Sequence, residues 1–272
     1  MKRFIISLLT LSLFSACSNK TEEPATPVVE SAPSIPQLDY SVVHSYPHDI
    51  TLFTEGFVFH NGQLFESTGS PEDLPQTKSM IGISDLNTGK FTKKIEIDKN
   101  TYFGEGIAFL NDKLYQLTYK NQLGFIYDAK TFKKTGQFTY NNAEGWGMTT
   151  DGSYLIMSDG THNLTYFDPV TLAPIKTLTV TESGAPQNHL NELEFIKGFI
   201  YANIWMENNI VKIDPANGQI VGKIDLTLLA SEAILKNPRM DVLNGIAYDA
   251  ATDKIYVTGK LWANIYEISF TH

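Results

Sequence analysis

The sequence predicts an all-β protein, a five-bladed β-propeller with about four antiparallel strands per blade. A phrase recurs five times, and its glycine, or the equivalent Glu192, returns in steps of 50, 41, 45 and 53 residues. Each phrase is followed by short β-type segments separated by turn residues. The last repeat lacks one strand, which the N-terminal segment can supply. These three observations predict a closed ring of blades.

Each repeat opens with an inner strand that follows one variable position. The five copies read Thr54-Glu55-Gly56-Phe57, Gly104-Glu105-Gly106-Ile107, Gly145-Trp146-Gly147-Met148, Leu190-Asn191-Glu192-Leu193 and Leu243-Asn244-Gly245-Ile246. In the first repeat, the turn Asn61-Gly62 leads to a second strand over residues 64–67. The outer half of each of the first four repeats is predicted to be a hairpin, with turns at residues 84–90, 127–131, 167–171 and 213–218.

The fifth repeat ends with one strand over residues 264–270. We expect residues 40–46, which alternate well, to supply its outermost strand and remove an exposed sheet edge. The one helix expected in the folded part covers residues 226–235, as a surface insertion between the fourth and fifth repeats.

The N-terminus has the pattern of an export signal. Lys2 and Arg3 precede a short apolar run over residues 4–14, which is too short to span a membrane. Small residues before Cys17, the single cysteine, resemble a bacterial lipobox, so we expect residues 1–16 to be a signal peptide and Cys17 to be lipidated. The alternative is a plain secretory signal with an incidental thiol.

Residues 18–37 are rich in Pro, Ser, Thr and Glu and are expected to form a disordered tether, leaving 38–272 as the propeller domain. The formal net charge of −9 argues against nucleic acid as a partner. It also predicts repulsion from anionic lipid, so membrane contact would depend on the lipid anchor alone. We therefore expect an exported bacterial lipoprotein on the periplasmic or cell-surface face of a membrane.

The variable positions of the five copies are predicted to converge at one mouth of the central channel. We call these the ring residues: Glu55, Glu105, Trp146, Asn191 and Asn244. One interpretation is that they only cap the channel and bind ordered water. That interpretation suits Asn244, but it suits the two glutamates less well, because two facing carboxylates repel each other unless one is paired or protonated.

Aromatic residues follow at a second fixed position. Tyr119 lies 14 residues after Glu105, and Trp205 lies 14 residues after Asn191, which places both at the same height of the same mouth. The alternative for these two is core packing between blades. Lys260 is the one cation of this set, and it either pairs with a carboxylate or is a solvated turn lysine.

The phrases together resemble the plant- and bacterial-type glutaminyl-peptide cyclotransferases over nearly all of residues 45–268. The residues that carry the resemblance are those at 53–56, 66–69, 103–107, 115–119, 144–149, 158–160, 190–194, 202–205, 243–249 and 257–262. The resemblance implies a five-bladed propeller and an aminoacyltransferase that converts an N-terminal glutamine of peptides or proteins to pyroglutamate with release of ammonia. It implies no metal and no cofactor, and we expect a monomer.

The resemblance also implies roles for individual residues. Glu105 falls on the acid–base position, with Asn191 and Lys260 as further catalytic residues. The substrate-binding positions are Phe53, Glu55, Phe103, Tyr119, Trp146, Trp205 and Asn244. Glu105 would transfer a proton from the α-amine to the leaving ammonia, and Lys260 would tune Glu105 or stabilise the oxyanion.

This chain departs from the family pattern at two of these positions. The family usually has Gln where this chain has Glu55, and Trp where it has Tyr119. The second carboxylate predicts that one of Glu55 and Glu105 holds a proton at neutral pH. Residues 70–75 depart as well and suggest a rearranged rim loop.

Two other functions fit parts of the pattern. A ring of Glu and Asn oxygens suits Ca²⁺, as in metal-dependent lactonase-type propellers, but Trp146, Lys260 and the count of five repeats argue against it. A non-catalytic propeller that binds peptide N-termini is the second alternative, favoured by the two departures.

Overall fold

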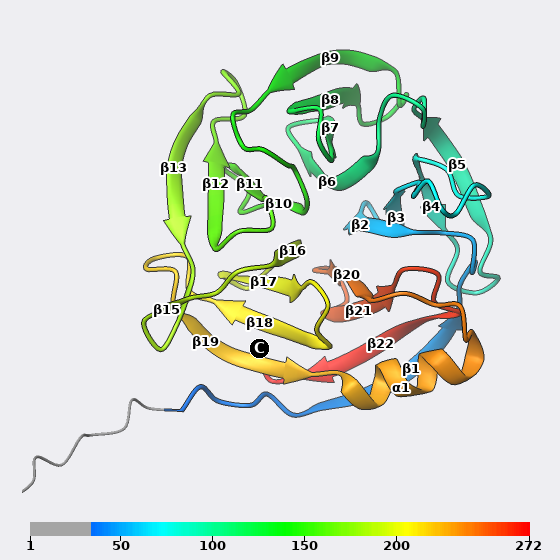
Figure 1. The fold of residues 1–272 in the computed structure, drawn as a ribbon, viewed down its shortest axis with the longest axis vertical. Helices are drawn as coiled ribbons and strands as arrows, with labels where there is room; N and C mark the ends of the chain where they lie inside the picture. Colours follow the sequence, from blue (N-terminus) through cyan, green and yellow to red (C-terminus); the bar gives the residue numbers. More distant parts are fainter. Residues whose placement is uncertain (1–33) are drawn as a thin grey trace, which may run out of the picture. The chain divides into compact units, whose positions relative to one another are not determined.

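The computed structural model describes residues 34–272, whose strands form five four-stranded antiparallel sheets around a central axis (Figure 1). From the axis outward, blade 1 comprises β2 (Thr54–His60), β3 (Gln63–Thr68), β4 (Met80–Ser84) and β5 (Phe91–Glu96). Blade 2 comprises β6 (Gly104–Leu110), β7 (Lys113–Thr118), β8 (Leu123–Asp128) and β9 (Lys134–Thr139). Blade 3 comprises β10 (Met148–Thr150), β11 (Leu155–Ser158), β12 (Asn163–Phe167) and β13 (Pro174–Thr179). Blade 4 comprises β16 (Leu190–Ile196), β17 (Phe199–Ile204), β18 (Asn209–Ile213) and β19 (Ile220–Asp225). The predicted five-bladed propeller is confirmed.

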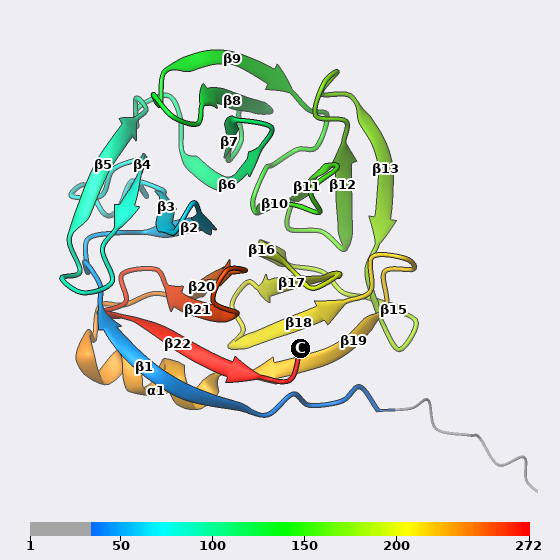
Figure 2. The same ribbon diagram turned by 180° about the vertical axis from the view of Figure 1, so that it is seen from behind.

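Blade 5 joins the two ends of the described chain. It comprises β20 (Leu243–Asp249), β21 (Lys254–Gly259), β22 (Asn264–Phe270) and, outermost, β1 (Tyr40–Pro47). The first and last strands lie side by side in both views, with Tyr40 opposite Phe270 and Pro47 opposite Asn264 (Figures 1 and 2). The predicted closure of the ring by the N-terminal strand is confirmed, and it covers an edge that β22 would otherwise expose.

The inner strands β2, β6, β10, β16 and β20 each contact their neighbours and form a closed ring. Glycine is required where they approach most closely. A Cβ on Gly106 would lie 2.4 Å from the Met148 nitrogen, and one on Gly147 would lie 2.2 Å from the Asn191 oxygen. The repeated glycine therefore allows adjacent blades to meet at the axis.

Blade 4 carries Glu192 where the other blades carry this glycine. Its buried carboxyl accepts hydrogen bonds from the backbone nitrogens of Phe57, at 3.1 Å, and Ile246, at 2.8 Å. Glu192 therefore links the inner strands of blades 4, 1 and 5 across the channel.

The predicted outer hairpins of the first four blades share one turn device. Asp85, Asp128, Asp168 and Asp214 each accept, through Oδ1, the backbone N–H two residues further along. An aspartate at this place organises the turn before the outer strand begins.

The expected helix is confirmed, with its bounds shifted by one residue. Helix α1 (Thr227–Lys236) follows β19 and packs Leu229, Ala230 and Ala233 into the core of blades 4 and 5. A small hairpin, β14 (Thr181–Glu182) with β15 (Ala185–Pro186), was not predicted. Within residues 34–272, no helix has the length and apolarity needed to cross a bilayer.

The expected signal peptide, Cys17 and most of the tether lie outside the described residues. The tether ends earlier than predicted. Pro36 and Leu38 exchange backbone hydrogen bonds with Lys223 of β19, and Ile35 packs against the core beside blade 4. The prediction of a disordered segment up to residue 37 is therefore wrong at its end, because an unpaired outer strand offers backbone partners to these residues.

Candidate active site

The ring residues lie at irregularities of the innermost strand pairs. The register shifts at Thr54/Gly56, Gly104/Ile107, Leu190/Leu193 and Leu243/Ile246, which are the positions of four of the five ring residues. A bulge leaves a residue out of the ladder and redirects its side chain. The repeated bulge therefore turns these side chains out of the blade interiors.

A cavity of about 600 Å³ lies where the inner strands begin. We call it the central pocket. It is lined by Phe53, Glu55, Pro71, Phe103, Glu105, Tyr119, Ala143, Glu144, Trp146, Asp159, Gly160, Thr161, His189, Asn191, Trp205 and Lys260. Nine of the ten residues that the sequence predicts for the site are among them, drawn from all five blades.

Asn244 is the exception. Its side chain is fully buried and donates through Nδ2 to the Thr54 oxygen at 3.0 Å and to Glu55 Oε2 at 3.3 Å. It therefore supports a carboxylate of the pocket from behind and does not form part of the wall. Because Asn244 does not line the pocket and its Nδ2 is bonded to blade 1, its direct contact with substrate stays a prediction.

Aromatic rings form two sides of the central pocket. Trp146 and Trp205 meet edge to face with ring centroids 5.6 Å apart. Phe103 contacts Phe53 at 6.3 Å and Tyr119 at 5.8 Å between centroids. These rings offer flat apolar surfaces for the carbon chain of a small substrate.

Lys260 is buried and paired inside the pocket, so it is not a solvated turn lysine. Its Nζ donates to Glu55 Oε1 at 2.8 Å and lies 4.7 Å from the centre of the Phe53 ring. Its direct hydrogen-bond partner is Glu55, and its charge also lowers the pKa of Glu105, the residue that Lys260 was expected to tune. Burial raises the pKa of Glu55 to about 7, against the lowering effect of the Lys260 ammonium.

Glu105 and Asn191 are two buried polar residues of the pocket wall. Glu105 is 4% exposed and Asn191 is 2% exposed, and both line the cavity. Their backbone oxygens accept bonds from Ser67 and Ser158, but neither side chain has a hydrogen-bond partner among residues 34–272. Buried polar groups are normally satisfied, so these two are poised to bind a ligand.

The pKa of Glu105 is raised well above its usual range. Burial is the largest cause, the charge of Glu55 adds to it, and the Lys260 ammonium opposes both. The predicted competition of the two carboxylates for one proton agrees with this arrangement.

Several residues of the wall were not among the predicted site residues, and the spacing along the chain locates two of them. Phe53 and Phe103 lie two residues before their ring residues, and Glu144 and His189 lie two before Trp146 and Asn191. Side chains two apart on extended chain share a face. Applying this spacing to all five copies identifies Glu144 and His189.

Glu144 is held in place by its neighbours. Trp146 Nε1 donates to Glu144 Oε2 at 2.9 Å, and Lys120 Nζ lies 3.6 Å from Oε1. The bond fixes the Trp146 ring against Gly160, where a Cβ would lie 2.7 Å from that ring. Gly160 is therefore required to seat the tryptophan.

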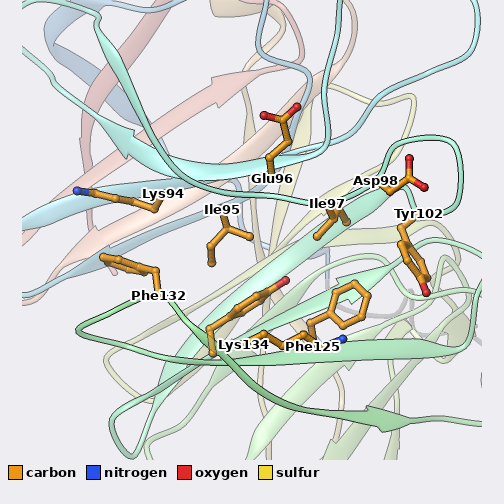
Figure 3. A pocket seen from close by; sticks show the side chains of 10 residues that line it. Lys94, Ile95, Glu96, Ile97, Asp98, Tyr102, Phe125, Phe132 and Lys134 are labelled. Atoms are coloured by element: carbon orange, nitrogen blue, oxygen red, sulfur yellow. The ribbon is translucent and has the colours of Figure 1, made fainter.

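A second cavity, of about 440 Å³, lies between the outer strands of blades 1 and 2 (Figure 3). It contains no ring residue. Lys94 lies over the Phe132 ring and Lys134 over the Phe125 ring, so both ammonium groups already have partners in its wall. The central pocket is therefore the better candidate for chemistry.

Within residues 34–272, no group of three or more His, Cys, Asp or Glu side chains is arranged to hold a metal ion. The two ring glutamates lie beside the ammonium of Lys260, which would repel a cation there.

Comparison with known proteins agrees with this site. The sequence profile of the family described as glutamine cyclotransferase matches residues 8–270. The chain is 40% identical over 233 residues to the glutaminyl-peptide cyclotransferase of Arabidopsis thaliana, covering 85% of this chain and 71% of that relative. The crystal structure of Myxococcus xanthus glutaminyl cyclase is similar, with a TM-score of 0.77 and 32% identity over 88% of this chain and 98% of that one. The resemblance seen in the repeated phrases is confirmed, and the chain belongs to the glutamine cyclotransferase family.

Proposed function

We propose that this protein is a glutaminyl-peptide cyclotransferase that acts on peptides or proteins with an N-terminal glutamine. Membership of the family supports the reaction, and the central pocket supports its location. The observation that carries the assignment is Glu105, a buried carboxyl that faces the cavity with no hydrogen-bond partner among the described residues.

The reaction joins two ends of one residue. The α-nitrogen attacks the γ-carbonyl carbon, a C–N bond forms, the bond to the amide nitrogen breaks, and ammonia leaves. The α-amine must lose a proton and the leaving nitrogen must gain one. A single carboxyl beside both nitrogens can perform both transfers, and a pKa raised toward neutrality suits it to this task. Glu105 lines the cavity and its pKa is raised well above its usual range, and both observations support that role.

The aromatic walls would hold the glutamine side chain folded, because cyclisation needs the two reacting atoms in contact. Trp146 and Trp205 form one such wall. The free amide of Asn191 would donate to the γ-carbonyl oxygen as it gains charge. Lys260 would act through Glu55, since its ammonium already bonds that carboxylate at 2.8 Å.

A peptide with N-terminal Gln tests the proposal directly. The protein is expected to release one ammonia per peptide and to leave a product blocked at its N-terminus. The same peptide with an acetylated α-amine is the matched control, since it lacks the nucleophile and should release none. Absence of ammonia from the free peptide would contradict the assignment.

We also propose that the chain is an exported lipoprotein, lipidated at Cys17, and a monomer. The basic n-region, the short apolar run and the small residues before Cys17 support the anchor. The test is fatty-acid labelling of the wild type and of Cys17→Ser in a bacterial host. Label in the wild type alone is the expected result, and label in both or neither would contradict the proposal. Sedimentation of residues 34–272 tests the monomer.

A further inference from the structure

A buried ion pair outside the central pocket joins the two segments that carry Glu55 and Lys260. His48 follows β1 and Glu66 lies in the middle of β3. Their side chains are 1% and 0% exposed, and His48 Nε2 lies 3.1 Å from both carboxylate oxygens. Neither residue lines the central pocket.

The bonding pattern indicates that His48 is charged. His48 Nδ1 lies 2.8 Å from the Trp262 carbonyl oxygen, which can only accept, so Nδ1 carries a proton. Nε2 faces a carboxylate, which also accepts. Burial lowers the pKa of His48, whereas the charge and hydrogen bond of Glu66 and the Trp262 carbonyl raise it, and the net shift is upward.

The pair holds one segment on each side of the pocket. Glu66 Oε1 accepts from Thr54 Oγ1 at 2.7 Å, and Thr54 stands between the pocket residues Phe53 and Glu55. His48 holds the carbonyl of Trp262, two residues after Lys260. Glu66 Oε2 accepts from Ser84 Oγ at 2.6 Å, which ties the pair to β4.

Resting on the function proposed above, we propose that His48 and Glu66 are positioning residues of the active site, which fix the segment carrying Glu55 against the segment carrying Lys260. The two segments come from blades 1 and 5, and we call the boundary between these two blades the seam. Without a link, small movements of this seam would change the 2.8 Å contact between Lys260 and Glu55. The buried pair links the two segments, and this link keeps Lys260 within bonding distance of Glu55.

Several charges act on the carboxyls that this network positions. Lys260 lowers the pKa of Glu55, and Asp241 raises it. Glu55 and Glu144 raise the pKa of Glu105, and Lys260 lowers it. Glu192 faces Glu55 from blade 4. Lys260 is the one cation among them, so its withdrawal raises the pKa of both Glu55 and Glu105.

The test is the pH profile of kcat/KM for Glu66→Gln. A glutamine fills the same space and keeps an acceptor for Thr54, but it removes the negative charge that pairs with His48, so the link between the two segments is weakened without opening a cavity. We expect kcat to fall about 10- to 100-fold and the acid limb of the profile to move to higher pH, because Lys260 no longer holds its place.

Tyr46→Phe is the matched control. Tyr46 lies on β1 and its hydroxyl donates to Glu267 Oε2 of β22 at 2.8 Å, so this variant loses a contact within blade 5 and none between blades 1 and 5. It should lower the melting temperature and leave the pH profile of kcat/KM unchanged.

Three outcomes decide the matter. A shifted limb in Glu66→Gln with an unshifted limb in Tyr46→Phe supports the inference. Equal profiles in Glu66→Gln and wild type, with only stability lowered, would overturn it and leave the proposed function intact. A wild type that releases no ammonia would contradict both. If Glu66→Gln does not fold, Thr54→Val removes one hydroxyl from the network, and an unshifted limb in that variant overturns the inference.

Discussion

Lys260 Nζ lies 2.8 Å from Glu55 Oε1, and both side chains are more than nine-tenths buried in the wall of the central pocket. The contact joins blade 5 to blade 1 across the seam of the propeller. It places a cation and a second carboxylate beside Glu105. The electrostatics of the proposed acid–base residue therefore depend on this pair.

Glu55→Gln and Lys260→Met should move the acid limb of kcat/KM in opposite directions. Glu55→Gln removes a negative charge near Glu105 and frees the ammonium, so the pKa of Glu105 falls and the limb moves to lower pH. Lys260→Met removes the positive charge, so that pKa rises and the limb moves to higher pH. Initial rates of ammonia release across pH measure both. Shifts in one common direction would contradict this electrostatic scheme.

Trp205→Ala should raise KM by about tenfold, because it removes one ring of an aromatic pair and the apolar contact it offers to substrate. Trp205 is 38% exposed, so little stability is lost. Its neighbour Met206, 66% exposed and absent from the pocket wall, gives the control Met206→Ala, which should change KM little. Equal KM changes in the two variants would show that the ring does not bind substrate.

The protein should lose stability as pH rises from about 5 to 8. Burial raises the pKa of Glu194 to about 8, and burial also raises that of Glu192. A raised folded-state pKa means that the native state binds more protons than the unfolded state, so the free energy of unfolding falls as pH rises from the unfolded pKa to the folded one. The melting temperature across pH checks this sign.

Glu194→Gln gives the matched variant for that measurement. Glutamine keeps an acceptor for the Tyr248 backbone nitrogen, which donates to Glu194 Oε1 at 2.9 Å, but it does not titrate. We expect the melting temperature of this variant to depend less on pH. Wild type loses on the order of a few kcal/mol of unfolding free energy by pH 8 as Glu194 ionises, and the variant does not. A slope equal to that of wild type would show that Glu194 is not the titrating group.

Chelation should leave activity unchanged. The carboxylates of the pocket face the Lys260 ammonium, so the oxygen set does not suit a divalent cation. Ammonia release is measured before and after dialysis against EDTA, with added Ca²⁺ as the second arm. Loss of activity that Ca²⁺ restores would favour the metal-dependent lactonase-type reading of the ring.

The repeated phrase predicted the fold because each copy has to solve the same local problem. Four of the five inner strands carry a glycine where blades meet, and the outer hairpins of the first four blades carry a turn aspartate such as Asp85. These requirements are local, so the same residue types recur at the same place in successive repeats. The ring closure was predictable for a related reason, since the last repeat was one strand short.

The contacts between repeats could not be predicted in the same way. The partner of Lys260 is Glu55, which is 205 residues away, and the partner of Asn244 is the same carboxylate. The sequence predicted no role for His48 or Glu66, because their role depends on the fold that brings Trp262 to His48. Side-chain direction at a seam is set by packing between blades, which no local spacing encodes.

The central claim is that Glu105 carries the proton in the cyclisation of N-terminal glutamine. The direct test is ammonia release from one Gln-peptide by wild type, Glu105→Gln and Glu194→Gln, all shown to be folded by circular dichroism. Glu194 is an equally buried glutamate with a raised pKa that lies outside the pocket. We predict activity in wild type and Glu194→Gln, and a loss of about 10²- to 10⁴-fold in Glu105→Gln. Turnover by Glu105→Gln at the rate of the wild type would contradict the account.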